Sequence, residues 1–230
     1  MKKQRPSSCA HLLSPFQSAN LLPPLSVAVK YLFLLLPEIL VFCIRDDMSV
    51  ELHIKNVCQS AYSELRRIST IRHLLSADST KTLVSAFALS RLDYCNSLLS
   101  GCPKQLLEKL QKVQNSAARL VLKAHKRDHV SPLLRTLHWL PIQACIEYKL
   151  STLCCSFFSD TGPVYLSDLL RVYSPSRQLR SSSDSRTLRI PHIKTKTFGH
   201  CSFSHAASSV LNSLPHDIRH IQSVTALKTP

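Results

Sequence analysis

The sequence predicts a mainly α-helical fold: a short-linked antiparallel helical bundle or array, with a basic Ser/Arg-rich irregular segment and a poorly structured amino-terminal leader. Three observations lead to this prediction. Apolar residues recur at steps of three and four over residues 49–160. No alternating strand pattern interrupts them, and the connections between them are short, which favours antiparallel neighbours. The 230 residues, 44% of them apolar, are enough to bury a core.

Residues 1–46 form a leader that differs in character from the rest. The apolar stretch 25–44 (LSVAVKYLFLLLPEILVFCI) has the length of a membrane span, but Lys30, Pro37 and Glu38 lie inside it. The favourable transfer free energy of its apolar side chains is nearly offset by the two charges and the proline, so insertion is marginal. A membrane anchor is therefore an alternative to a buried apolar element or a stretch with no selected structure.

The apolar spacing next predicts three longer helices. The first covers about 50–75. The second begins at a cap supplied by Asp78 or Ser79 and continues to about residue 100, where a glycine and a proline end it. The third covers 104 to about 124.

Shorter helices are predicted after these. Ser131, followed by a proline, opens a fourth helix that continues through Leu140. A fifth covers 142–158, and the tail contains a helix over 203–214 and the start of another near His216. Trp139, Tyr94 and Tyr148 lie within these apolar patterns, so we interpret them as core side chains and not as base-stacking platforms.

The charge of the chain points to a polyanionic partner. The formal net charge is +15, and a nucleic acid heads the list of partners for such a surface. Only three glycines are present, which excludes glycine-rich nucleotide-binding loops, and only 14 carboxylates, which leaves few ligands for multi-metal catalysis.

A basic Ser/Arg-rich linker is predicted over 161–200. Its part 171–200 contains seven Lys or Arg residues and one Asp. Cations interspersed with hydroxyls suit nonspecific contact with an RNA or DNA backbone, and the alternative is a disordered linker without a partner. The candidate phosphate contacts in this segment are Arg177, Arg180, Arg186, Arg189, Lys194 and Lys196. A second candidate patch consists of Lys109, Lys112, Lys123, Lys126 and Arg127.

The nine cysteines contain no C-x-x-C pair, which predicts reduced thiols in an intracellular chain and not a disulfide framework. The nearest approach to a zinc site is Cys95 and Cys102 with His125 and His129. Six residues separate the two cysteines, whereas structural sites use two to four. We therefore expect no metal and no cofactor.

Beyond residue 46 the sequence contains several stretches that resemble a known protein family. The stretches SRLDYCNSLLSGCP, LQKVQNSAARLVL, HVSPLLRTLHWLPI and FGHCSFSHAASSVLNSLP resemble the region that follows the polymerase palm in the reverse transcriptase polyproteins of LINE-type (non-LTR) retrotransposons. The resemblance extends over residues 47–230. It implies a helical, thumb-like domain over 47–160, whose helices guide template and primer in the family, and a truncated carboxyl-terminal region over 201–230.

The resemblance does not include the palm or its metal-binding aspartates. Asp46 and Asp47 are adjacent, but Asp47 matches the turn before the first helix of the family, and two neighbouring carboxylates do not make a two-metal site. The resemblance thus implies a catalytically inactive fragment, at most a nonspecific RNA- or DNA-binding module, whose other partner would be the palm of a full-length element. A small membrane-anchored protein and a translated remnant with no selected function are the alternatives.

The chain also departs from the family pattern at single positions. His125, Cys145 and Cys201 stand where the family has Arg, and Leu211 stands where it has Trp. Because a large aromatic side chain is missing at position 211, we expect the tail to pack less well.

Overall fold

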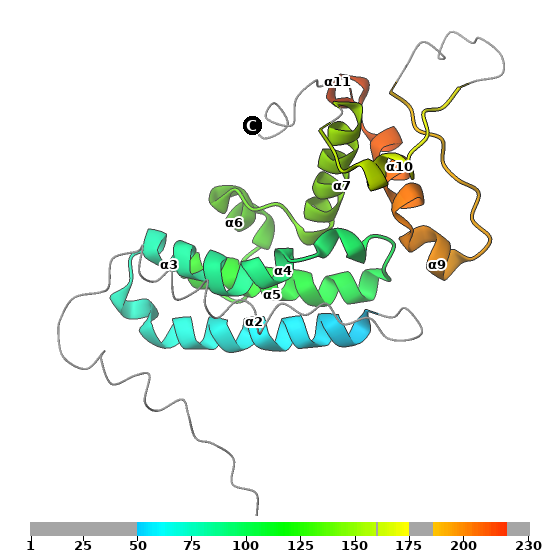
Figure 1. Ribbon diagram of the computed structural model, residues 1–230. Helices are drawn as coiled ribbons and strands as arrows, with labels where there is room; N and C mark the ends of the chain where they lie inside the picture. Colours follow the sequence, from blue (N-terminus) through cyan, green and yellow to red (C-terminus); the bar gives the residue numbers. More distant parts are fainter. Residues whose placement is uncertain (1–49, 160, 175–185, 220–230) are drawn as a thin grey trace, which may run out of the picture. The chain divides into compact units, whose positions relative to one another are not determined.

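The computed structural model describes residues 50–159, 161–174 and 186–219, and this part of the chain is mainly helical (Figure 1). The only strand-like pairing among these residues is a single antiparallel bridge between Val172 and Leu188. The leader, with its apolar stretch 25–44 and the membrane anchor predicted there, lies outside the described residues. Within the described ranges, we find no helix with the length and apolar character needed to cross a bilayer.

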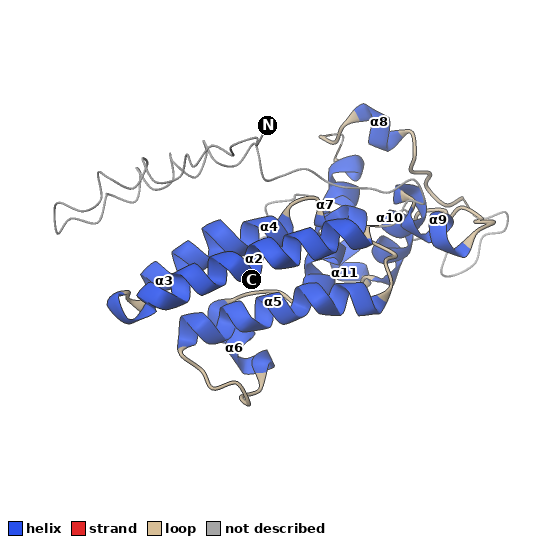
Figure 2. Cartoon of the chain, turned by 90° about the horizontal axis from the view of Figure 1, so that it is seen from below, coloured by secondary structure: helices blue, strands red, loops and turns tan. Residues whose placement is uncertain are grey.

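The first half of the described chain makes three helical passes. Its elements are α2 (Glu51–Ile71), the 3-10 turn η2 (Arg72–Leu74), α3 (Ala77–Val84), the π-helical turn η3 (Ser85–Leu89), α4 (Ser90–Asp93), the 3-10 turn η4 (Asn96–Leu99) and α5 (Lys104–Leu122). Figure 2 shows α2 beside α5. Glu51 contacts Lys109, and Arg72, just past α2, contacts Leu120 near the end of α5. The first and third passes therefore run in the same direction, with the second pass antiparallel to both.

The main apolar cluster fills the space between these passes. It is built from residues three and four positions apart, the spacing that places side chains on one face of a helix. Its buried members include Ile54, Ala61, Leu65 and Ile68 of α2, Val84 and Ala88 of the second pass, and Leu110, Val113, Ala117 and Val121 of α5.

The second half contributes shorter helices around one long one. Its elements are α6 (Val130–Leu137), α7 (Ile142–Phe158), α8 (Val164–Ser167), α9 (Lys196–Cys201), α10 (Phe203–Ser213) and α11 (His216–Arg219). Ile146 and Leu150 of α7 belong to the main cluster. Cys154, one turn further along α7, belongs to a second cluster with Leu170, Leu188, Ala207 and Leu211. One helix therefore borders both apolar clusters.

The sequence prediction is closest for α5 and α7. The bounds of α7 are as predicted, and α5 ends at Leu122, two residues before the predicted end. The predicted second helix is wrong in two respects. Its cap is Ser76, whose side chain accepts the Ser79 N–H at 3.1 Å, and not Asp78 or Ser79. The helix also breaks well before residue 100.

The break lies at Tyr94, because the next residue, Cys95, adopts the left-handed region at φ 53°, which no right-handed helix can continue through. Tyr94, predicted as a core side chain, is consequently 36% exposed. Leu98, which also lies within the range of the predicted second helix, is exposed as well. The chain resumes as the short turn η4 and leads into α5.

The fourth helix also differs from its prediction. It begins at Val130, so that Ser131 lies inside it, and it ends at Leu137, because His138 takes the left-handed region at φ 56°. Trp139 therefore follows the helix instead of lying in it. Trp139 is partly buried and packs against the main cluster, as its interpretation as a core side chain requires.

The tail of the described chain packs against α7. The helices predicted over 203–214 and from His216 are present as α10 and α11. Leu211, where the resemblance led us to expect a Trp, is fully buried, and α10 packs along α7. The predicted irregular segment 161–200 contains α8, most of α9 and the Val172–Leu188 bridge.

Candidate nucleic-acid interface

A groove of about 500 Å³ lies between α2 and α5. Its lining residues are Glu51, Leu52, Lys55, Cys58 and Tyr62 from α2, and Lys109 and Lys112 from α5. The α2 members follow the three-to-four-residue spacing of a single helix face. Two of the predicted phosphate contacts, Lys109 and Lys112, therefore lie together, and the fold adds Lys55, which was not among the predicted contacts.

The lysines of the groove are available to an anion. Lys55 and Lys112 are exposed, and neither has an ion-pair partner among the described residues. Lys109 Nζ lies 3.5 Å from Glu51 Oε1, with both side chains more than half exposed, so water screens this pair and it is weak. The groove thus has three ammonium groups and one carboxylate.

The sulfur at the bottom of the groove carries no charge. Burial raises the pKa of the Cys58 thiol above its ordinary value, and the nearby Lys109 ammonium opposes this only in part. The thiol is therefore protonated at neutral pH and does not repel a phosphate.

The rest of the predicted second patch lies elsewhere. Lys123 is the left-handed residue that ends α5, and Lys126 and Arg127 are exposed in the loop that follows. Lys123 lies eleven positions after Lys112 along the helix, which corresponds to a rise of roughly 16 Å. A carboxylate orders this loop, since Asp128 Oδ2 accepts the His125 N–H at 2.6 Å. The five predicted cations therefore form two groups, with Lys109 and Lys112 in the first half of α5 and the other three at and after its carboxyl end.

The candidates in the Ser/Arg-rich segment are placed only in part. Arg177 and Arg180 lie outside the described residues, as does the side chain of Lys196. Arg189 and Lys194 are exposed. Their exposure leaves both side chains accessible to a phosphate.

Arg186 is not a free surface cation. Its guanidinium carbon lies 5.5 Å from the centre of the Phe158 ring, and its Nη1 donates to the carbonyl of Arg219 at 3.1 Å. The side chain is partly buried and packs α7 against the end of the described tail. Its assignment as a phosphate contact is therefore replaced by a packing role, which its charge alone did not reveal.

Arg72 is a second cation with a structural role. Its side chain is buried, at 8% exposed. Its guanidinium donates to the carbonyls of Leu120 at 3.0 Å, Val121 at 2.8 Å and Leu75 at 2.8 Å. Two of these carbonyls belong to the last turn of α5, where helix carbonyls lack intrahelical partners and a cation is favoured.

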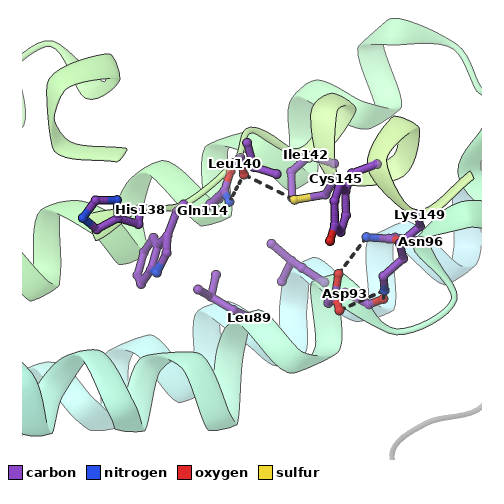
Figure 3. Close-up of a pocket in the computed structure, with 12 residues that line it drawn as sticks. Leu89, Asp93, Asn96, Gln114, His138, Leu140, Ile142, Cys145 and Lys149 are labelled. Carbon is purple, nitrogen blue, oxygen red and sulfur yellow. Dashed lines mark hydrogen bonds and ion pairs between the residues drawn. The ribbon is translucent and has the colours of Figure 1, made fainter. Parts of the chain in front are cut away.

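A second cavity, of about 340 Å³, lies beside the second pass, the α6–α7 connection and α7 (Figure 3). Trp139 and Tyr148 contribute aromatic walls. At its polar end, Lys149 Nζ lies 2.9 Å from Asp93 Oδ2, and Asn96 Nδ2 donates to Asp93 Oδ1 at 2.9 Å. Because these charges already neutralise each other, the cavity offers apolar walls and no free ionic group.

The four residues of the zinc alternative do not converge. Cys95 and Cys102 precede α5, whereas His125 and His129 follow its other end. The 19 residues of α5 correspond to roughly 28 Å. Among the described residues, no three His, Cys, Asp or Glu side chains lie close enough to share a metal ion.

Comparison with known proteins adds no assignment. Neither the protein-family models nor the curated proteins nor the solved structures contain a match to this chain.

Proposed function

We propose that this chain is a catalytically inactive module that binds RNA or DNA through the phosphate backbone, without base sequence preference. Its origin in the post-palm region of a LINE-type reverse transcriptase is part of the proposal and rests on the motifs quoted from the sequence. The binding surface is the groove between α2 and α5.

One observation carries the proposal. Lys55, Lys109 and Lys112 come from two helices that are distant in sequence, yet they line one open groove with only Glu51 opposing them. A solvated helix face would distribute its cations without convergence. Converging cations raise the local potential for a polyanion and release counterions when it binds.

The proposal is tested by filter binding of the full chain to labelled RNA and DNA over a range of salt concentrations. Affinity should fall steeply and linearly on a log–log scale, because each phosphate contact releases condensed counterions. A flat salt response would remove the electrostatic mechanism and with it the proposal.

A pair of variants assigns the binding to the groove. Lys55→Gln combined with Lys112→Gln should lower the salt slope for single strands by about 1.4, since each lost phosphate contact contributes about 0.7. Arg135→Gln removes one exposed cation of α6 that does not line the groove, and this control should bind nearly as the unchanged chain does. Equal losses in both variants would place the binding outside the groove.

The absence of catalysis is tested separately by primer extension with magnesium and all four deoxynucleotides. The proposal expects no extension of a hybridised oligonucleotide by the purified chain. Extension that persists through purification would overturn the proposed inactivity while leaving binding intact.

A further inference from the structure

We propose that the α2–α5 groove selects single-stranded over double-stranded nucleic acid, because it takes one unstacked base against the ring of Tyr62 beside its lysines. This inference rests on the proposed function and adds to it a ligand class and a stacking residue. It comes from the position of Tyr62 in the same groove as Lys55 and Lys112.

The Tyr62 ring is placed to act as a platform. It is partly buried, packs against the main apolar cluster and also lines the groove, so the core fixes its position while part of the ring stays accessible. A base that stacks on an already ordered ring costs little conformational entropy of the protein. Stacking on an aromatic side chain tolerates every base, because each base has a π-face.

The surroundings of the ring suit a base and not a phosphate. Leu52, 45% exposed, adds apolar surface to the same groove. Cys58 presents an uncharged thiol. The cations at the groove can hold the backbone while the base reaches the apolar interior, the combination of basic groove and aromatic platform that single-strand binders use.

A duplex cannot use this arrangement fully. Its bases are paired and stacked inside, so it presents phosphates to the lysines and nothing to Tyr62. It therefore gains only the electrostatic part of the binding free energy. A single strand gains the electrostatic part together with stacking.

The first experiment measures fluorescence polarisation of the full chain with labelled oligo(dT), oligo(rU) and a blunt duplex of equal length. Tyr62→Leu should weaken binding of both single strands about 5- to 100-fold, the range expected for loss of one stacking contact. It should leave duplex binding within about twofold, and Tyr62→Phe should restore single-strand binding. Tyr165→Leu, at an exposed tyrosine of α8, is the matched control and should change nothing.

The second experiment needs no variant and so does not depend on how well Tyr62→Leu folds. A bromodeoxyuridine-containing single strand is irradiated on the unchanged full chain, and the crosslinked peptide is identified by mass spectrometry. We expect the crosslink at Tyr62.

The outcomes separate the two proposals. A crosslink that maps to the loop 123–129 or to the Ser/Arg-rich segment, or equal loss of duplex and single-strand affinity in Tyr62→Leu, overturns the inference and leaves phosphate binding intact. Competition by polyglutamate as effective as by oligo(dT) also overturns it, in favour of a general polyanion site. Binding that lacks salt dependence overturns both.

Discussion

Asn212 of α10 holds Leu188 through both polar groups of its backbone. The Leu188 N–H donates to Asn212 Oδ1 at 3.0 Å, and Asn212 Nδ2 donates to the Leu188 carbonyl at 2.8 Å. The Asn212 side chain thus forms the pair of hydrogen bonds that a further strand beside Leu188 would form. These bonds fix Leu188 in the second apolar cluster, where the leucine is 1% exposed.

The first prediction follows from this pair. Asn212→Ala should lower the free energy of unfolding by about 1–3 kcal/mol, because it removes two hydrogen bonds and leaves backbone groups beside a buried leucine without partners. Asn56→Ala, at an exposed position of α2, should stay within about 0.5 kcal/mol of the unchanged chain. Urea denaturation followed by circular dichroism measures both, and equal stability of the two variants would contradict the role of Asn212.

Arg72 gives the second prediction. Arg72→Met should lower the free energy of unfolding by about 2–4 kcal/mol, because the carbonyls of Leu120, Val121 and Leu75 lose a charged donor. Arg66→Met removes an exposed cation of α2, the helix that precedes Arg72, and should have little effect. A nucleic-acid role for Arg72 would instead appear as lost binding at unchanged stability.

Gly101 gives the third. Its backbone has φ +80°, and an added Cβ would lie 2.9 Å from the His200 carbonyl oxygen. Gly101→Ala should therefore lower the free energy of unfolding by about 1–3 kcal/mol, through backbone strain together with the steric conflict. At Gly162 the nearest atom would lie at 3.3 Å and φ is not in the left-handed region, so Gly162→Ala is the milder control. A lower melting temperature for Gly162→Ala than for Gly101→Ala would contradict this prediction.

The fourth prediction concerns alkaline pH. Burial raises the pKa of Cys154 from its ordinary value near 9 to about 12, and burial, helped by Cys201, raises that of Cys102 to about 11. The unfolded chain loses these protons at lower pH than the folded chain does. The contribution of these two thiols to the free energy of unfolding is therefore complete below pH 9. It decreases above pH 9, by at most about 1.4 kcal/mol per pH unit for each thiol.

The measurement is urea denaturation from pH 8 to pH 11 under reducing conditions. The double variant Cys102→Ser, Cys154→Ala should show a shallower decrease than the unchanged chain, whatever its stability at pH 8. All other ionisable groups are the same in both proteins and cancel in the comparison. Identical slopes would show that the two thiols are accessible to solvent.

Local sequence signals predicted those helices whose ends are marked by proline or by a change of composition. Pro141 precedes α7, and a polar stretch follows it, so its bounds are readable. The break after Tyr94 could not be predicted in this way, because the left-handed residue there is Cys95 and not glycine. A cysteine at such a position is stabilised by its tertiary surroundings and leaves no mark in the sequence.

The candidate site was predictable only as a set of cations. Lys109 and Lys112 were identified from charge, but Lys55 and Tyr62 join them because α2 and α5 pack side by side, a pairing that no local pattern reports. Charge also could not distinguish Arg72 and Arg186, which bind carbonyls inside the fold, from lysines that face solvent.

The position of α7 has a mechanical consequence. The first turns of α7 pack into the main apolar cluster and its later turns pack into the second cluster, so this one helix joins the two. If the tail detaches, the apolar side chains at the carboxyl end of α7 are exposed to water. If the three-pass region opens, the apolar side chains at its amino end are exposed. The described part of the chain should consequently unfold as one unit. A substitution that destabilises the second cluster at Leu211 should also lower the stability of the main cluster around Ile54.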